Sequence, residues 1–533
     1  MSDAPERPAG TGRSALLIAV GILCTRLTGL IRSRVFAHYF GLGFEADAFA
    51  AALRIPNFLQ NLFGEGVLSG SFIPVYAALV ARGEPKHADR VAGAVASLLA
   101  LAVSAIVLAG VLATPWMIAL IAPGFTGETR ALTIRVVRIL FPGAGLLVLS
   151  AWALGVLNSH HRFLLSYTSG VMWNASMITT LVIFGPHTDL PRLAAILAWG
   201  SVIGSGLQFA VQVPVVLRVA PDLRFALDTA SGEVRTVVRN FVPVFISRGV
   251  VQVSAYVDQF LASWLPTGAV AGLTNAQLLY MLPVSLFGMS VSAAELPAMS
   301  GVAMPNAAGL EALRRRLNTG LRQIAFFVVP SAMAFLALGD VVAAALLQTG
   351  RFVHADAVYV WGILAGSSVG LLASTLGRLY SSSYYALRDT RTPLRFAIIR
   401  VVLTTALGYV CAIPLPRWLG ISERWGVAGL TASAGVAGWI EMLLLRRRLN
   451  ERIGQTGLPA SYVSMLWLAA AAGAATAWAV RLTVPIANPI IAAVVILGPY
   501  GLVFFAIAFA LRIPEASRLV SRLTARRRQQ SGW

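Results

Sequence analysis

Residues 98–121, LLALAVSAIVLAGVLATPWMIALI, run for 24 positions without a charged side chain. A helix of this length crosses a hydrocarbon core about 30 Å thick. Comparable stretches follow one another along the whole chain, which is 57% hydrophobic, 12% charged and has a mean hydropathy of +0.75. A soluble protein carries about 25% charged residues. The composition therefore predicts an all-α polytopic membrane protein.

We expect 14 transmembrane helices and no soluble domain longer than a loop, with spans two and eight interrupted by glycine or proline. The first span begins near Ser14. We interpret it as a retained helix rather than a signal peptide, because Arg26 and Arg32 interrupt it and no small-residue cleavage site follows. The predicted span centres are Gly21, Asn61, Ile106, Leu146, Ala175, Gly204, Ser254, Leu286, Pro330, Gly370, Leu407, Ser433, Ala471 and Phe504.

The formal net charge of +20 comes from short clusters of arginine and lysine between the apolar spans. With the N-terminus inside, the loops and termini on that side carry 27 of these residues and the opposite loops carry 6. Because basic loops remain cytoplasmic, both termini are predicted to lie in the cytoplasm. Charge in clusters of this kind marks topology, so no nucleic acid partner is expected.

Two pairs of similar stretches are separated by the same number of positions. The Ile55-Pro56 dipeptide is repeated as Leu282-Pro283, and the stretch that ends at Phe125 is repeated up to Phe352, in both cases 227 positions later. This pattern predicts two six-helix lobes related by a parallel pseudo-repeat, plus two C-terminal helices. The expected divisions are a cytoplasmic tail at 1–13, lobes at 14–220 and 237–448, a cytoplasmic linker at 221–236, helices 13–14 at 449–511, and a basic tail at 512–533.

Parallel repeats are typical of transporters that work by alternating access to a central cavity. Ionisable residues within spans usually face such a cavity, because burying them in lipid costs at least ~2.5 kcal/mol each. We expect Arg26 and Arg32 to share much of one helix face there, and Glu65 to lie at a helix break in Gly64-Glu65-Gly66. Other charges within the predicted spans are Arg34, Asp47, Arg54, Arg135, Arg138, Arg248, Asp258, Glu295, Arg378 and Arg400.

Simpler interpretations exist for several of these charges. Arg32 and Arg34 would snorkel to the membrane interface, and Asp47 would cap a helix. Asp258 and Glu295 would form ion pairs with arginines, Arg248 being the candidate partner of Asp258.

Arginines in a wet cavity favour a phosphate ligand, since guanidinium groups form paired, charge-assisted hydrogen bonds with phosphate oxygens. The sequence contains no Walker A motif and no nucleophile–base constellation, so we expect a carrier rather than an enzyme. No cofactor or metal is expected, because Cys24 and Cys411 lie inside apolar spans and the histidines lack ligand spacing. Energy would come from an ion gradient or the membrane potential.

The polar pattern of spans one and two resembles the MurJ/MviN family of lipid II flippases, and the resemblance extends over essentially the full length. It is carried by Thr25-Arg26-Leu27-Thr28-Gly29, Ala46-Asp47-Ala48-Phe49, Arg54-Ile55-Pro56-Asn57, Leu62-Phe63-Gly64-Glu65-Gly66, Ala122-Pro123-Gly124-Phe125 and the 385–393 stretch YALRDTRTP. The resemblance implies a V-shaped, 14-helix flippase that moves undecaprenyl-linked peptidoglycan precursor to the outer leaflet. It also implies a location in the bacterial inner membrane and a groove for the lipid tail formed by the last two spans.

The resemblance implies roles for Arg26 and Arg32 in the cavity and for Asp47, Asn57 and Glu65 as polar positions. Two positions depart from the family pattern: Gln60 and Leu278 stand where basic residues are usual. Arg34, Arg54 or Arg248 would have to compensate. The candidate substrate-binding set is therefore Arg26, Arg32, Asp47, Arg54, Asn57, Gln60, Glu65 and Arg248.

The departures leave two alternatives open: an exporter of another polyprenyl-linked glycan or amphiphile, and a scaffold for wall synthases that transports nothing. The partners expected are lipid II or a similar lipid-linked glycan and the membrane itself. The sequence indicates no protein partner.

Overall fold

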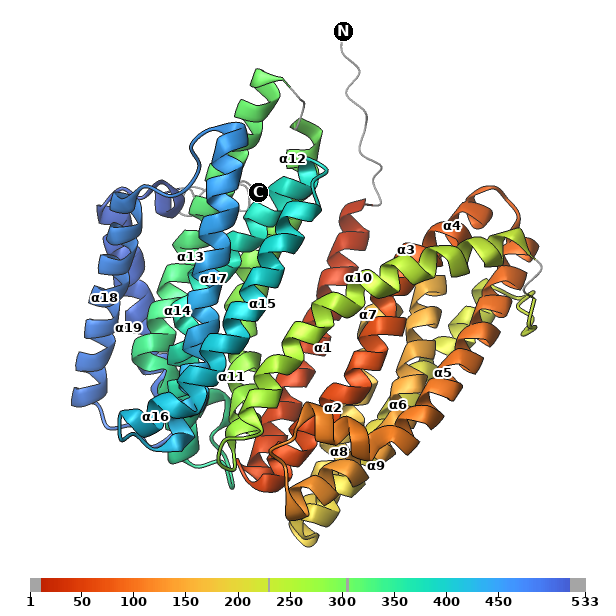
Figure 1. Ribbon diagram of the computed structural model, residues 1–533, viewed down its shortest axis with the longest axis horizontal. Helices are drawn as coiled ribbons and strands as arrows, with labels where there is room; N and C mark the ends of the chain where they lie inside the picture. Colours follow the sequence, from red (N-terminus) through yellow and green to blue (C-terminus); the bar gives the residue numbers. More distant parts are fainter. Residues whose placement is uncertain (1–10, 229–230, 303–305, 518–533) are drawn as a thin grey trace, which may run out of the picture. The chain divides into compact units, whose positions relative to one another are not determined.

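The computed structural model describes residues 11–228, 231–302 and 306–517 (Figure 1). Over these ranges the chain folds as helices joined by loops, and β structure is limited to an isolated bridge between Thr349 and Phe352. The all-α prediction is confirmed. Contacts divide the described chain into two compact units, one comprising residues up to 271 with 349–352, the other 272–348 with the residues from 353 onward.

The described residues of the first unit form ten α-helices, a short 3-10 helix and the beginning of an eleventh α-helix, which continues into the second unit. They are α1 Thr11–Phe40, α2 Phe44–Phe63, α3 Glu65–Ser71, α4 Ile73–Ala81, α5 Pro85–Ile121, α6 Gly127–Ser159, α7 Phe163–Thr168, α8 Gly170–Phe184, η1 Gly185–His187, α9 Leu190–Val219, α10 Gly232–Ala262 and α11 Ala269–Pro283.

The second unit continues through a π-helical turn, long helices and two short connecting helices. They are η2 Val284–Met289, α12 Ser290–Val302, α13 Ala307–Leu347, α14 His354–Ala386, α15 Arg391–Ala412, α16 Pro414–Trp418, η3 Glu423–Trp425, α17 Gly426–Ile453, α18 Ala460–Thr483 and α19 Pro489–Ala510.

The helix α10 is where the contact-based units differ from the lobes expected from the repeat. The repeat assigned residues 237–448 to one lobe, whereas α10 packs on α2, α3 and α5 and is grouped with the first unit. The lobe boundaries drawn from the repeat remain a prediction.

Eleven helical segments of the described chain are long and apolar enough to cross a membrane. Their outer surfaces are apolar as well: Leu112, Trp116 and Leu120, four residues apart on α5, are 65%, 76% and 74% exposed. A surface that presents a continuous apolar stripe of this kind is stable in contact with lipid rather than water. The protein is therefore a multi-pass membrane protein.

Both predicted interruptions of spans are present. The helices α2 and α3 are separated at Gly64, where a Cβ atom would lie 2.2 Å from the Gln60 carbonyl oxygen, so no larger residue fits without movement of the backbone. The Gly64 N–H donates to that same carbonyl at 2.7 Å. In the predicted eighth span, Pro283 ends α11 and the π-helical turn η2 follows before α12. Proline lacks the N–H that a regular helix would need there.

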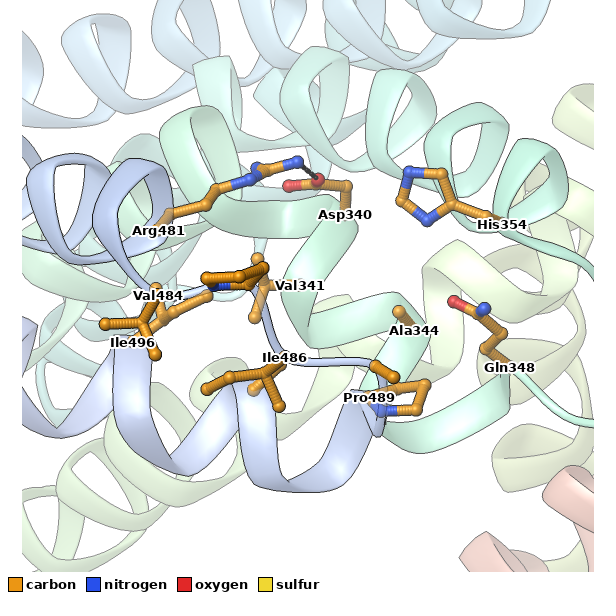
Figure 2. A pocket seen from close by; sticks show the side chains of 13 residues that line it. Asp340, Val341, Ala344, Gln348, His354, Arg481, Val484, Ile486, Pro489 and Ile496 are labelled. Carbon is orange, nitrogen blue, oxygen red and sulfur yellow. Dashed lines mark ion pairs between the residues drawn. The ribbon is translucent and has the colours of Figure 1, made fainter.

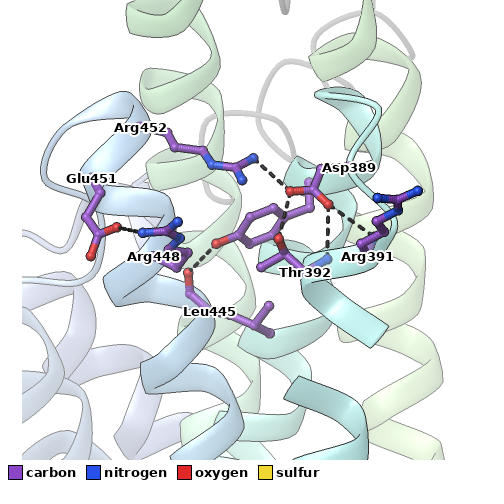
Figure 3. Close-up of polar contacts among 8 residues, drawn as sticks. Asp389, Arg391, Thr392, Leu445, Arg448, Glu451 and Arg452 are labelled. Atoms are coloured by element: carbon purple, nitrogen blue, oxygen red, sulfur yellow. Dashed lines mark hydrogen bonds and ion pairs between the residues drawn. The ribbon is translucent and has the colours of Figure 1, made fainter. Parts of the chain in front are cut away.

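The family-like stretch at 385–393 forms a capped turn between α14 and α15 (Figure 3). The Asp389 carboxylate accepts hydrogen bonds from the backbone N–H groups of Arg391 and Thr392, at 3.1 and 3.0 Å, and from the Thr392 hydroxyl at 2.7 Å. It also pairs with the Arg452 guanidinium at 2.8 Å, which links the turn to α17. The conspicuous aspartate of this stretch therefore holds a helix start in place.

We expect Asp389→Ala to lower the free energy of unfolding by about 1–2 kcal/mol, because helix-start N–H groups lose their acceptor. Thermal unfolding of the purified protein in detergent measures the change. The control is Glu451→Gln, which removes an exposed partner of Arg448 at the same end of α17 and should have almost no effect. An unaltered unfolding midpoint in Asp389→Ala would contradict the capping role.

The same contact predicts a pH dependence. Burial raises the pKa of Asp389, but the hydrogen bonds from Thr392 and the Arg452 charge outweigh it and leave the pKa below its usual value. A carboxyl whose pKa is lowered by folding stabilises the protein above its unfolded pKa of about 3.9, and this stabilisation is lost as the pH falls further. The difference in unfolding midpoint between the native protein and Asp389→Asn should therefore shrink below about pH 4.

Candidate functional site

Arg32 lies on α1 against an aromatic ring of α8. Its guanidinium carbon is 4.7 Å from the centre of the Trp173 ring, and the Trp173 indole N–H donates to the Ser201 hydroxyl of α9 at 3.0 Å. The side chain is half-buried. A stacked guanidinium keeps its N–H edge available, and the described residues provide no hydrogen-bond acceptor or carboxylate for it. Arg32 is thus an oriented cation able to bind an anion.

Polar contacts anchor this part of α1 to α8. The Asn174 side-chain amide donates to the Thr25 carbonyl at 3.4 Å and to the Thr28 hydroxyl at 3.3 Å. The Thr25 hydroxyl in turn donates to the Tyr167 carbonyl at 2.7 Å. Sequence reasoning missed Trp173 and Asn174 as supports for Arg32. The available signal was a polar Trp-Asn pair inside an otherwise apolar span.

Arg26 is exposed on the same helix, and no acceptor among the described residues contacts it. Six residues separate it from Arg32, which on a regular helix is a rotation of about 600°, or a difference of about 120° around the axis. The prediction that the two arginines share much of one face is therefore wrong. They present charge in two directions.

The polar residues of α2 form a second group. Arg54, Asn57 and Gln60 follow at three-residue spacing, and all three are half-buried. The Arg54 backbone carbonyl accepts a hydrogen bond from the Tyr256 hydroxyl at 2.9 Å, and the Arg54 charge interacts with Asp258 of α10. Asp258 therefore interacts with Arg54, and the ion pair expected with Arg248 stays a prediction because the Arg248 side chain lies outside the described residues.

Asp47 caps a helix, as the simpler interpretation of its charge predicted, but the helix is a different one from its own. Its buried carboxylate accepts hydrogen bonds from the backbone N–H groups of Gly268 and Ala271, at 2.6 and 2.7 Å. These are groups that α11 leaves unpaired at its N-terminus, where a negative charge also interacts favourably with the helix dipole. Asp47 thus caps α11, at the point where the chain leaves the first unit, and not its own helix.

The 349–352 turn contacts the end of α1, a few residues before Asp47. The Arg351 N–H donates to the His38 carbonyl at 2.9 Å, and the His38 ring is hydrogen-bonded to the Thr349 hydroxyl at 2.9 Å. The end of α1 and the start of α2 therefore anchor both the beginning of α11 and the 349–352 turn.

Two members of the candidate set, Glu65 and Arg248, have side chains that lie outside the described residues. Of the other charges within spans, Glu295 pairs with Arg316 at 3.1 Å, as the ion-pair alternative expected. Arg400 is about half exposed and pairs with Glu441 at 3.2 Å, and Arg378 is exposed on the otherwise largely buried α14. Cys24 and Cys411 are free thiols. Within the described ranges, His, Cys, Asp and Glu form no group of three that could hold a metal ion.

Solved structures share this fold. The chain aligns with a structure titled "Lipid II flippase MurJ, inward closed conformation" at a TM-score of 0.75 and 23% identity, covering 93% of this chain and 99% of that one. An inward-facing multidrug resistance MATE family transporter of the MOP superfamily aligns at a TM-score of 0.66 and 18% identity, covering 82% and 98%. The chain therefore has the helical membrane fold of these two structures.

Sequence comparison identifies the family. The model described as "Lipid II flippase MurJ" matches residues 36–505. The lipid II flippase MurJ of Burkholderia cenocepacia is 30% identical, covering 83% of this chain and 84% of that protein. A probable lipid II flippase MurJ of Bdellovibrio bacteriovorus is 31% identical, covering 82% of each. The chain belongs to the lipid II flippase MurJ family, which confirms the resemblance seen in the sequence.

We expect Asp47→Ala to lower the free energy of unfolding by about 2–3 kcal/mol, because two buried N–H groups lose their acceptor. Asp47→Asn keeps one acceptor oxygen and should lose about half as much. The matched control is Asp189→Ala, which removes an exposed cap of α9 and should cost about 1 kcal/mol or less. Thermal unfolding in detergent compares the three. Equal losses at residues 47 and 189 would refute the buried cap.

Proposed function

We propose that this protein moves lipid II, the undecaprenyl-pyrophosphate-linked peptidoglycan precursor, from the inner to the outer leaflet of the bacterial inner membrane by alternating access. Membership of the lipid II flippase MurJ family supports the substrate. The observation within the chain that carries the proposal is the oriented guanidinium of Arg32 on Trp173.

A pyrophosphate bridge is the part of lipid II that arginines recognise. Guanidinium N–H groups form short, charge-assisted hydrogen bonds with phosphate oxygens, and stacking on an indole limits the orientations that Arg32 can adopt. Arg54 is expected to contribute less, because Asp258 already compensates part of its charge. Arg26, exposed and facing another direction, would meet the headgroup at a different stage of its passage. Asn57 and Gln60 would donate neutral hydrogen bonds.

The proposed topology has fourteen spans. Adding α1, the α7–α8 pair and α10 to the eleven apolar segments gives this number. Both termini would then be cytoplasmic, in agreement with the bias of basic loops. Two six-span lobes related by a parallel repeat would form the transport path, and α18–α19 would form a groove for the lipid tail.

We propose that transport is driven by an ion gradient or by the membrane potential, which supplies about 2.3 kcal/mol per charge for each 100 mV. The family relationship implies a transporter rather than an enzyme, and the sequence contains no motif for nucleotide hydrolysis.

Export of a different polyprenyl-linked glycan is the second candidate. It is favoured by Gln60 and Leu278, which are uncharged where the family usually has basic residues. Fewer cationic contacts suit a headgroup with less negative charge.

Complementation separates these candidates. Expression of this chain in a bacterium depleted of its own lipid II flippase should restore growth and make labelled lipid II accessible to a probe outside the cell. Correct membrane insertion without rescue would favour the second candidate. Arg32→Glu should abolish rescue, whereas Arg417→Glu, at an exposed arginine paired with Glu423, should retain it. Rescue by Arg32→Glu would instead support a scaffold that transports nothing.

The stacked arrangement predicts an order among the Arg32 variants. In proteoliposomes, Arg32→Gln should slow lipid II flipping by about tenfold or more, since a charge-assisted contact is lost. Arg32→Lys should fall between the native protein and Arg32→Gln, because lysine keeps the charge but not the planar donor edge. Equal rates for Arg32→Lys and Arg32→Gln would show that charge at this position is not what the substrate uses.

A further inference from the structure

A cavity of about 250 Å³ lies in the second unit between α13, the start of α14 and the α18–α19 connection (Figure 2). All the residues that line it belong to the second unit, whereas Arg26, Arg32 and Arg54 belong to the first. The side chains around it divide into a polar group and an apolar group. The polar group includes Asp340, His354 and Arg481, and the apolar group includes Ile486, Ala492 and Ile496.

The helix α13 is kinked beside this cavity. Leu338 has a non-helical backbone conformation, with φ −135° and ψ 17°. Two tryptophans satisfy carbonyls at the kink: the Trp361 indole N–H donates to the Leu336 oxygen and that of Trp478 donates to the Ala337 oxygen, each at 3.0 Å. Irregular backbone at membrane depth is tolerated where it is buried in protein or lines a cavity. Specific hydrogen bonds within the second unit therefore stabilise the kink.

An incompletely satisfied ion pair forms the polar wall. Asp340 Oδ2 lies 2.8 Å from Arg481 Nη2, and the two side chains are 6% and 30% exposed. The second carboxylate oxygen, Oδ1, is buried and has no hydrogen-bond partner among the described residues. Arg481 stacks over Trp478 at 4.9 Å and has further N–H groups with no acceptor in that part of the chain. The pair therefore offers one unused acceptor and several unused donors.

The lining selects the charge of a ligand. Asp340 and Arg481 cancel each other, so a ligand with net charge would lie uncompensated beside an apolar wall. A group with no net charge, carrying both a donor for Oδ1 and an acceptor for Arg481, satisfies both sides. The apolar wall, which includes Ile486 and Ile496, requires that the rest of the ligand be apolar.

The position along the helices points to a lipid. Arg481 is two residues before the end of α18, and Asp340 is seven residues, or about 10 Å, before the end of α13. Arginine and tryptophan near helix ends are typical of the level of lipid headgroups. On α19, Ile491 and Val494 flank the lining residue Ala492 and are 53% and 70% exposed, which provides a surface for acyl chains.

We propose that this cavity binds the headgroup of a zwitterionic phospholipid with a primary ammonium, of the phosphatidylethanolamine type. The ammonium donates to Asp340 Oδ1, and the phosphate accepts from the free N–H groups of Arg481. A choline headgroup has the same net charge but no N–H donor, and a glycerol headgroup carries uncompensated negative charge. The site is accessory to transport and does not depend on which lipid-linked glycan is moved.

Native mass spectrometry of the delipidated full-length protein tests this proposal. Phosphatidylethanolamine, phosphatidylcholine and phosphatidylglycerol with identical acyl chains are titrated separately. We expect phosphatidylethanolamine to bind about tenfold more tightly than the other two, the effect of one charge-assisted hydrogen bond. Equal binding of ethanolamine and choline lipids by the native protein would overturn the proposal without any variant. Binding of soluble phosphoethanolamine but not of the lipid would overturn it as well.

Three variants test whether this cavity is the source of the preference for the ethanolamine lipid. Asp340→Asn should remove the difference between ethanolamine and choline lipids, and Ile486→Trp, which fills the cavity without touching the ion pair, should weaken binding of the ethanolamine lipid. Arg417→Gln breaks an exposed ion pair elsewhere in the same unit and should leave the tenfold preference unchanged. Unchanged binding of the ethanolamine lipid by Ile486→Trp would place the lipid elsewhere. Because Ile486 lies in a connection, this test remains informative if Asp340→Asn fails to fold.

Discussion

Backbone polar groups within a membrane must find partners inside the protein, because lipid offers none. This constraint accounts for the placement of the polar side chains in both units. At the helix break, the Gly64 N–H donates to the Gln60 carbonyl. At the Leu338 kink, two indole N–H groups donate to carbonyls that the kink would otherwise leave unpaired. At the start of α11 the acceptor is the Asp47 carboxylate. A polar residue in such a chain can therefore serve as a partner for the backbone, as Asp47 does.

The features that the sequence predicted are those with local causes. Apolar length predicts the spans, and glycine or proline predicts the breaks at Gly64 and Pro283, since each effect acts within a few residues. The role of Asp47 could not be predicted in this way, because its partner Gly268 is 221 positions away. The same holds for Arg32, whose orientation depends on Trp173 of another helix. The charged residues were recognisable as candidates, but their partners were not.

Arg26, Arg32 and Arg54 differ in what surrounds them, and under the proposed function these differences would grade their availability to an anion. Arg54 interacts with Asp258, which lowers the net charge that it presents. Arg32 keeps its full charge and loses rotational freedom on the Trp173 ring, so less entropy is lost when it binds. Arg26 keeps its freedom and its exposure. Under the proposed function, anion recognition in this unit would depend more on the environment of each guanidinium than on the number of arginines.

The closed backbone at Gly64 has a consequence for how this chain could diverge from its relatives. Because the Gly64 N–H holds the Gln60 carbonyl in place, the main chain at residue 60 is set independently of the side chain it carries. Exchange of glutamine for a basic residue there alters the electrostatics of the helix face without remodelling its path. Residue 60 can accordingly be exchanged on an unchanged scaffold, whereas a side chain at residue 64 would require the backbone to move.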